Sequence, residues 1–564
     1  MSLMKKHSLT EKLKKLQSEL DRSNDDSHLV NLLINFSESV VDECRKLTEE
    51  NKELKNIISK LKGEQSTPTI RKQTKGSGGD GDHSSENDRN KNKSRKKRGK
   101  GKNGSKRSRV KVDETIYLTM SWDELPSDAT KQGVREKLSQ DITITTYNTL
   151  FKRQMYFSPS ENKSYLAPLP PGYEGGYGPN IKAWANALYS KGQMTIDKIT
   201  WVFKTAGSII TNPTLHGFIM STEESMSEQK IAIIKSGLAS TSYQHLDDTS
   251  AREKGKNRFV NTLGNDYYSA YFTLSGKDRL SIIEMLSLDK MRFYVNEESF
   301  SLAATMGLPE KYIRELRKYA SLEYLTRNNI NAILDKLLPD KSKYKKHRKS
   351  ILEATAIAAY QKGPYAIKQL IVDDAPQFKL ITEELGLCWV HEGRHYKKMK
   401  PVFAKNTKIL DKFIDNFWVY YHKLLRYKEN PTKAVAKLLK EEFVSLFSQI
   451  TGYAKLDKQL VLTLKKKDAL LLVLKYPHIP PHNNPAELMA RYQARSRDIH
   501  LHTMSTQGTN AKDSLATVAG TSDKLSVNLF HYLYDIITKQ FKMTSLAELI
   551  TIRANTEYPM PDLS

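Results

Sequence analysis

Hydrophobic residues near the start of the chain recur every seven positions. The row consists of Leu33, Val40, Leu47, Leu54 and Leu61, and residues 1–62 contain no Gly or Pro. The positions that would alternate with this row in a heptad are Ser37, Cys44, Asn51 and Ile58. A single buried Asn in such a row favours two strands in a fixed register. We expect a helical, leucine-zipper-like coiled coil over residues 1–62, with two chains pairing through residues 33–61. A surface helix packed on its own chain is the alternative.

Residues 63–111 have almost no apolar side chain to bury, which predicts a disordered linker. From Arg89 to Lys111, 13 of 23 residues are Lys or Arg and none is acidic. Such a segment is either a solvated tail or an arm that follows DNA phosphates without reading sequence. We expect the second, with Lys96, Lys97 and Arg98 among the contacts.

The pattern over residues 112–235 predicts a small DNA-binding region. Ile116 and Leu118, then Ile142 and Ile144, alternate with polar residues as strands do. Ile196 to Phe203 has the pattern of a helix. A tight turn at residues 206–208 follows, and Thr211 is placed to cap a second helix. This outline is typical of a helix-turn-helix, although other small helical bundles share it.

From residue 236 onward the pattern predicts an α/β fold. The expected strands are Tyr243–Asp247, Phe259–Leu263, Tyr268–Leu274, Gln369–Asp373 and Leu387–Val390. Helical stretches separate the third strand from the fourth and occupy residues 395–475. Two helices follow Pro485, with a loop near Gln507–Lys512, and residues 546–564 form a C-terminal tail.

Composition narrows the class of protein. No apolar run reaches the roughly 20 residues of a spanning helix, so we expect no membrane segment. Two cysteines without spacing partners argue against a thiolate zinc site, and no zinc is expected. The net charge of +26 favours a polyanionic partner such as nucleic acid.

Three acidic positions could carry chemistry. Asp247 and Asp248 end one predicted strand, Asp373 and Asp374 end another, and Glu487 opens a helix. Singly, each is better explained as a turn, a cap or a favourable charge at a helix start. Together, carboxylates from two strand ends and one helix can hold two Mg²⁺ ions for phosphoryl transfer.

The surrounding motifs make the chain resemble the insertion-sequence 66 family of bacterial transposases. The matching motifs lie in the family's order at Leu246–Asn257, Val372–Phe378, Leu387–His395 and Pro481–Glu487, and the resemblance spans about residues 150–545. It implies a ribonuclease H-like core in three parts: residues 236–394, a helical insertion at 395–480, and residues 481–545.

The resemblance places the catalytic, metal-binding carboxylates on Asp247, Asp373 and Glu487, with two Mg²⁺ or Mn²⁺ ions. Neighbouring side chains of a strand point to opposite faces, so only one member of each aspartate doublet can face the site. A shift of one residue would select Asp248 or Asp374 instead. The Cys388–His391 segment resembles a transposase signature, and it either orders the site or is simply core. Arg394 is expected to contact DNA phosphate.

The implied function is cleavage of the ends of a mobile element and joining of the 3′-hydroxyls to target DNA. The partners are then double-stranded DNA, a second copy of the chain and accessory transposition proteins. The location is the cytoplasm and nucleoid of a bacterium. The alternatives are a catalytically decayed transposase acting as a DNA-binding regulator and a related metal-dependent nuclease. In one departure from the family, residues 63–242 lack the cysteines of its zinc-binding segment.

Overall fold

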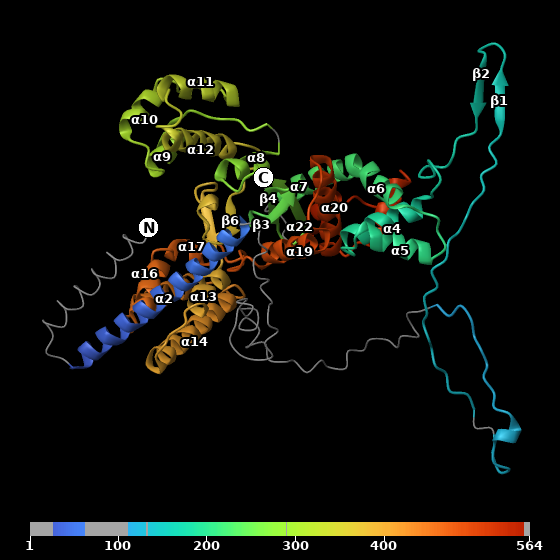
Figure 1. The fold of residues 1–564 in the computed structure, drawn as a ribbon, viewed down its shortest axis with the longest axis horizontal. Coiled ribbons are helices and arrows are strands. Elements are labelled where there is room, and N and C mark those ends of the chain that lie inside the picture. Colours follow the sequence, from blue (N-terminus) through green and yellow to red (C-terminus); the bar gives the residue numbers. More distant parts are fainter. Residues whose placement is uncertain (1–25, 62–110, 131–132, 289, 558–564) are drawn as a thin grey trace.

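The computed structural model describes residues 26–61, 111–130, 133–288 and 290–557. Figure 1 shows a mixed α/β body with helical lobes towards one end and two thin arms at the other. Within the described ranges, no helix combines the length and the apolar character that a membrane crossing requires.

A five-stranded mixed sheet lies at the centre of the fold, in the order β5–β4–β3–β6–β7. Its strands are β3 (Tyr243–Glu253), β4 (Lys256–Gly264), β5 (Ser269–Leu274), β6 (Gln369–Val372) and β7 (Glu384–Leu387). Strands β3 to β5 form an antiparallel meander, and β6 continues the sheet parallel to β3 and to β7. Strands are therefore confirmed at four of the five predicted positions. The predicted strand Leu387–Val390 is wrong, because β7 ends at Leu387 and a helix begins at Trp389.

The sheet buries apolar side chains on both faces. Leu246, Leu263 and Leu370 belong to the main core, whereas Tyr243 and Ile371 pack in a smaller cluster on the opposite face. Helix α19 (Asn484–His500) lies against β3 and β4. Helices α7 (Glu223–Ser240), α20 (Thr506–Lys524) and α22 (Leu546–Glu557) pack together beside β5. This scaffold holds strand β3 and the start of α19 next to each other.

Two helical blocks interrupt the sheet. Between β5 and β6 lie α8 (Arg279–Ser287), α9 (Glu297–Thr305), α10 (Glu310–Arg317), α11 (Arg327–Leu337) and α12 (Lys345–Gln361). Between β7 and α19 lie α13 (Trp389–Lys397), α14 (Ala404–Tyr427), α15 (Lys433–Ser448), α16 (Ala454–Leu464), α17 (Lys467–Leu470) and α18 (Leu472–Lys475). Both blocks extend to the left of the sheet in Figure 1. In the second, the buried ring of Trp389 packs among the rings of Phe417, Tyr420 and Phe443, which stabilises the insertion.

Helix α2 (Asp26–Leu61) packs on this second block of the same chain. Glu38 is buried and accepts hydrogen bonds from the backbone amides of Val402 and Phe403 and from the side chain of Asn406. It therefore caps the start of α14, whose own cap residue, Phe403, has no side-chain acceptor.

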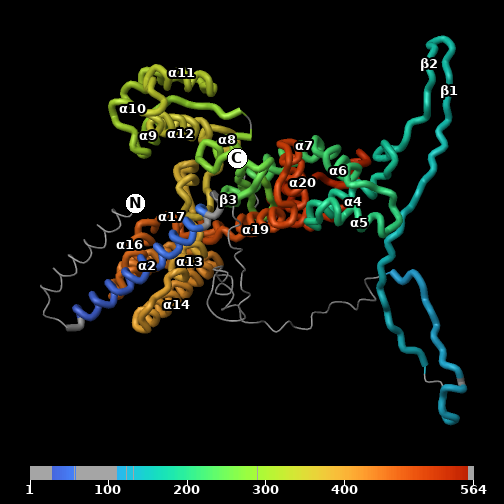
Figure 2. The backbone as a smooth tube through the Cα atoms, in the orientation of Figure 1, coloured from blue at the N-terminus to red at the C-terminus, as the bar shows by residue number. Residues whose placement is uncertain are grey.

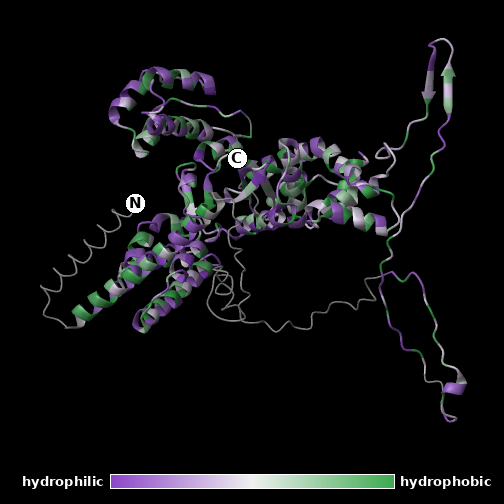
Figure 3. Cartoon of the chain, viewed as in Figure 1, coloured by the Kyte–Doolittle hydropathy of each residue, from purple (hydrophilic) through white to green (hydrophobic). Residues whose placement is uncertain are grey.

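Four further residues of α2 contact the insertion on the same side as Glu38, namely Asn31, Asn35, Asp42 and Arg45. Their spacing of three or four residues defines one polar stripe along the helix. The leucine row lies on the other side, and Leu33, Leu47 and Leu54 are 48%, 41% and 55% exposed. Hydrophobic and hydrophilic residues accordingly alternate along α2 in Figure 3. Packing on its own chain is thus confirmed for the polar stripe, and dimerisation through the leucine row stays a prediction.

Two long arms carry the residues between the linker and the helical body, as the tube in Figure 2 shows. One contains a short 3₁₀ helix, η2 (Trp122–Glu124), and the other a hairpin of β1 (Met155–Ser158) and β2 (Lys163–Leu166). The strands predicted around Ile116–Leu118 and Ile142–Ile144 are wrong, because neither segment pairs with a strand in the part of the chain that the structure describes. Leu118 and Ile142 are 91% and 81% exposed.

Helices α4 (Pro179–Ser190), α5 (Ile196–Thr205) and α6 (Asn212–Ser221) pack together after the arms. The predicted cap is confirmed, since the Thr211 hydroxyl accepts a hydrogen bond from the amide of Thr214. The helix–turn–helix outline of α5 and α6 is therefore present, and its use in reading DNA stays a prediction.

Two expectations near the C-terminus are wrong. The loop predicted at Gln507–Lys512 lies inside α20, which begins at Thr506 after the capping residue Ser505. The predicted tail contains α22, in which Leu546 and Ile550 are fully buried. These apolar residues pack on the body of the fold, so the described part of this segment, to residue 557, belongs to the fold.

Candidate functional site

Asp247 on β3 lies level with Asp373, the first residue after the end of β6. The parallel ladder between β3 and β6 pairs Tyr243 with Gln369 and His245 with Ile371. Two further steps along each strand lead to Asp247 and Asp373. Because side chains two residues apart share a face, both aspartates lie on the face of His245 and Ile371.

The prediction that Asp247 and Asp248 end their strand is wrong, since β3 continues to Glu253 in its pairing with β4. Only the pairing with β6 ends before Asp247, because β6 ends at Val372. Asp247 therefore lies at the carboxyl end of the parallel part of the sheet, which is where α/β sheets commonly form ligand sites.

The second aspartate of each doublet is held by other side chains. Asp248 accepts a hydrogen bond from the Gln377 amide at 3.1 Å. Asp374 forms ion pairs with Lys379 at 2.9 Å and Lys466 at 2.8 Å. Burial alone would raise the pKa of Asp374, but the two lysines lower it. Asp248 and Asp374 thus have partners of their own, away from Asp247 and Asp373.

The Pro481–Glu487 motif is tied to strand β3 just before Asp247. Asn483 donates its amide to the carbonyl of Leu246 at 2.9 Å, and its oxygen lies 2.9 Å from Nδ1 of His245. Burial lowers the pKa of His245 to about 3, so the ring is neutral and can serve as the hydrogen-bond donor at Nδ1. Thr262 of β4 also contacts the Ala486 carbonyl. These bonds fix the start of α19, and hence Glu487, over the face that carries Asp247.

Helix α13 supplies the basic side chains of the site. Arg394 forms an ion pair with Glu487, in which Nη2 lies 2.5 Å from Oε2. Cys388, directly before α13, lies with its Sγ 3.9 Å from the other carboxylate oxygen of Glu487. Burial, and secondly the charge of Glu487, raise the pKa of this thiol to about 11, so it stays protonated at neutral pH. The pKa of His391 is lowered by burial, which the charge of Asp373 opposes.

The carboxylates interact electrostatically. The pKa of Asp247 rises to about 7, mainly through burial and then through the negative charge of Asp373, with a smaller contribution from Glu487. No three His, Cys, Asp or Glu side chains among the described residues form a group that could hold a metal ion. Asp247 is nevertheless a buried carboxylate whose ionisation is opposed by neighbouring negative charge, and carboxylate oxygens are the ligands that hard divalent cations prefer.

Of the predicted site residues, the structure places Asp247, Asp373, Glu487 and Arg394 in one region. Lys96, Lys97 and Arg98 lie outside the described residues. Asn483 was not among the predicted site residues, although it lies inside the Pro481–Glu487 motif. Nor was the Arg394–Glu487 ion pair predicted, since the two residues come from helices far apart in the chain.

Comparisons with known proteins point to one family. Residues 343–511, which include Asp373 and Glu487, match the family model described as Transposase IS66 family. A relative from Sinorhizobium fredii (strain NBRC 101917 / NGR234), an uncharacterized protein called y4jO, is 27% identical over 314 residues. This match covers 54% of the present chain and 94% of the relative. No solved structure matches the chain. Residues 343–511 are therefore similar to the Transposase IS66 family, and Asp247 lies outside the matched region.

Proposed function

We propose that the protein is a DNA transposase that uses Asp247, Asp373 and Glu487 to cleave the ends of a mobile element and join them to target DNA. The observation that carries the proposal is the level placement of Asp247 and Asp373 beside Glu487, within a chain that contains an IS66 family domain. The sheet, with three antiparallel strands followed by two parallel ones, is the arrangement expected of a ribonuclease H-like core.

The contacts of the doublets support Asp247 and Asp373 as the working members. Asp374 is neutralised by two lysines and Asp248 is bonded to Gln377, so neither is as available for a cation as its neighbour. Asp247 has no basic side chain among the causes that shift its pKa. A divalent cation would relieve its repulsion with Asp373.

Asp247, Asp373 and Glu487 would hold the divalent cations, either Mg²⁺ or Mn²⁺. When bound, such ions activate the attacking oxygen and stabilise the departing one. Glu487 has to leave Arg394 to complete the carboxylate set, because the ion pair occupies one of its oxygens in this arrangement. The freed guanidinium is then available for a phosphate of the DNA, which matches the expected role of Arg394.

Other parts of the chain would bring DNA to this site. Helices α5 and α6 provide a helix-turn-helix outline, and the basic residues between Arg89 and Lys111 would follow the phosphate backbone. The exposed leucine row of α2 would pair two chains and so hold two element ends together.

The test is strand cleavage and transfer in vitro on DNA carrying the element's own ends. Wild type is compared with Asp373→Asn and Asp247→Asn, with Asp248→Asn as a doublet control and with Asp415→Asn on the exposed face of α14 as a surface control. We expect both reactions in Mg²⁺ from wild type and the surface control, and a loss of at least about 1000-fold in Asp373→Asn.

Each other outcome has a defined meaning. Binding of the ends without cleavage by any of the proteins would indicate a DNA-binding regulator and overturn the proposal. Cleavage without joining would indicate a nuclease. If Asp248→Asn is inactive while Asp247→Asn is active, the working member of the first doublet is Asp248.

A further inference from the structure

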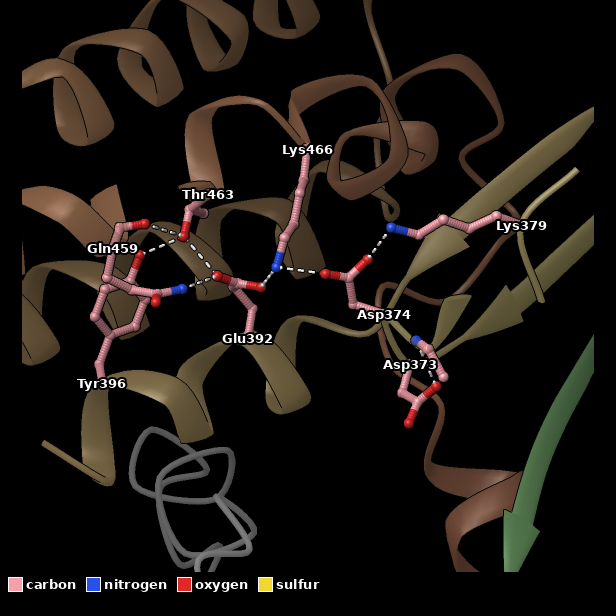
Figure 4. A network of polar contacts seen from close by, with 9 residues as sticks. Asp373, Asp374, Lys379, Glu392, Tyr396, Gln459, Thr463 and Lys466 are labelled. Atoms are coloured by element: carbon pink, nitrogen blue, oxygen red, sulfur yellow. Dashed lines mark hydrogen bonds and ion pairs between the residues drawn. The ribbon is translucent and has the colours of Figure 1, made fainter. Parts of the chain in front are cut away.

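A chain of four alternating charges connects the second aspartate doublet to the helical insertion (Figure 4). It runs from Lys379 to Asp374, on to Lys466 and then to Glu392. The Lys466 ammonium lies 2.8 Å from Asp374 and 2.9 Å from Glu392, so it bridges two carboxylates. Lys466 belongs to the insertion, between α16 and α17, while Asp374 follows β6 and Glu392 lies on α13.

Three of the four charges, all but Lys379, are largely shielded from solvent. The side chain of Glu392 is 3% exposed, that of Lys466 17% and that of Asp374 25%. Glu392 also accepts hydrogen bonds from Gln459 and Thr463 of α16, and Thr463 contacts the hydroxyl of Tyr396. Separating such a pair leaves one charge buried and uncompensated, so the paired arrangement is strongly favoured.

The position of Asp374 bears directly on Asp373. Lysines engage both carboxylate oxygens of Asp374, Lys379 at Oδ1 and Lys466 at Oδ2, so its side chain is fixed from two directions. Asp374 lies in a bend directly beyond the end of β6, and in the same bend the Ala375 amide donates a hydrogen bond of 3.1 Å to Oδ1 of Asp373. Fixing Asp374 therefore fixes the bend, and with it the amide that orients the Asp373 carboxylate.

We propose that Lys466 is a positioning residue, which acts through Asp374 to aim Asp373 and thereby couples the helical insertion to the catalytic centre. The same lysine holds Glu392 on α13, the helix that carries His391 and Arg394. One side chain of the insertion thus orients both the strand end with Asp373 and the helix that contacts Glu487. The inference rests on the proposed function, because it assumes that Asp373 binds the cation.

The test measures Mn²⁺ binding by electron paramagnetic resonance, alongside strand cleavage at several Mn²⁺ concentrations. The variants are Lys466→Met, which keeps the length of the side chain without its charge, and Lys466→Arg, which keeps the charge. The matched control is Lys423→Met, which removes a lysine from the partly exposed Lys423–Glu442 pair of the same insertion. Residues that orient a metal ligand typically contribute 10–100-fold to metal affinity.

We expect Lys466→Met to bind Mn²⁺ about 10-fold or more weakly and to need correspondingly more Mn²⁺ for cleavage. The Mn²⁺ affinity of Lys466→Arg should remain within about 3-fold of wild type, and that of Lys423→Met should equal wild type. A structural defect alone would lower the amount of folded protein without changing the Mn²⁺ affinity of the folded fraction. If Lys466→Met does not fold, Glu392→Gln/Lys466→Met removes both members of the buried pair and serves in its place.

The outcomes separate the inference from the proposed function. Equal Mn²⁺ affinity in wild type and in a folded variant lacking Lys466 would overturn the inference while leaving the transposase proposal intact. Equal Mn²⁺ binding in wild type and Asp373→Asn would mean that Asp373 holds no cation, and both proposals would be lost.

Discussion

Asn483 donates its side-chain amide to the backbone carbonyl of Leu246, 2.9 Å away. One end of this bond lies four residues before Glu487 and the other directly before Asp247. The amide oxygen of Asn483 also contacts His245, so one side chain joins the start of α19 to strand β3 at two points.

We predict that Asn483→Ala separates these two elements. The substitution leaves the Leu246 carbonyl and the His245 ring without their partner in a buried place, which costs about 1–3 kcal/mol in the free energy of unfolding. Strand cleavage should fall further, by about 10-fold or more, because Glu487 is no longer held in place. Urea denaturation and cleavage assays measure the two effects. Asn328→Ala, at an exposed position of α11, is the control. Equal free energies of unfolding and equal cleavage rates in the two variants would contradict the prediction.

The pKa of Asp247 predicts a pH dependence of stability in the absence of metal. Folding raises this pKa from 3.8 to about 7, so the folded state favours the protonated form. The corresponding stability is fully present below about pH 4 and is lost as the pH rises through about 7. Asp247→Asn should therefore be more stable than wild type at pH 8 in EDTA and should lose this part of the pH dependence. Thermal unfolding between pH 4 and 8 tests this, with Asp415→Asn as the control. A wild-type advantage at pH 8 in EDTA would refute it.

We predict that Arg394 contributes to DNA binding only when a divalent cation is present. Without the cation, Glu487 holds the guanidinium. In Ca²⁺, Arg394→Gln should weaken binding and reduce the slope of log affinity against log salt by about one, as expected for one lost phosphate contact. In EDTA, the variant and wild type should bind alike. Arg314→Gln on exposed α10 serves as the control, because its effect should be the same in both conditions. An effect of Arg394→Gln that is equal in Ca²⁺ and EDTA would show that Glu487 does not control this arginine.

The leucine row of α2 predicts a dimer that can be disrupted without unfolding the single chain. Leu47 and Leu54 are 41% and 55% exposed, so Leu47→Glu/Leu54→Glu should leave the single chain intact. The same change should destroy a coiled coil, because it places charges in the seam. Light scattering should show a dimer for wild type and for Lys52→Glu, and a monomer for the double variant. A wild-type monomer at micromolar concentration would eliminate the zipper.

The positions of β3 to β6 could be predicted from their apolar residues, but the end of β3 could not, because its pairing with β4 extends it to Glu253. Whether a predicted strand has a neighbouring strand to pair with could not be predicted in the same way. Ile116 and Ile144 have the alternation of strand residues but lack a neighbouring strand, and alternation alone cannot supply one. At β7 the apolar run continued into Trp389, and the change from strand to helix at Cys388 had no local signal such as Gly or Pro.

The candidate site shows the same limit. The three carboxylates were found from their motifs, since each stands beside residues of recognisable spacing. The contacts around those carboxylates were not predicted, because packing between distant segments brings Arg394 to Glu487, Lys466 to Asp374 and Asn483 to the Leu246 carbonyl. In a Lys-rich segment, the sequence alone does not distinguish a basic residue that forms an ion pair from one that faces solvent.

The two sides of α2 predict different genetic behaviour for an inactive copy of the protein. The polar stripe around Glu38 contacts the chain that carries it, whereas Leu33, Leu47 and Leu54 are exposed and are proposed to pair with a second chain. A copy of the protein with Glu487→Gln and an intact leucine row should enter mixed dimers and suppress transposition by the normal copy in the same cell. The same inactive copy with Leu47→Glu and Leu54→Glu should be recessive, since it can no longer form a dimer with the normal copy.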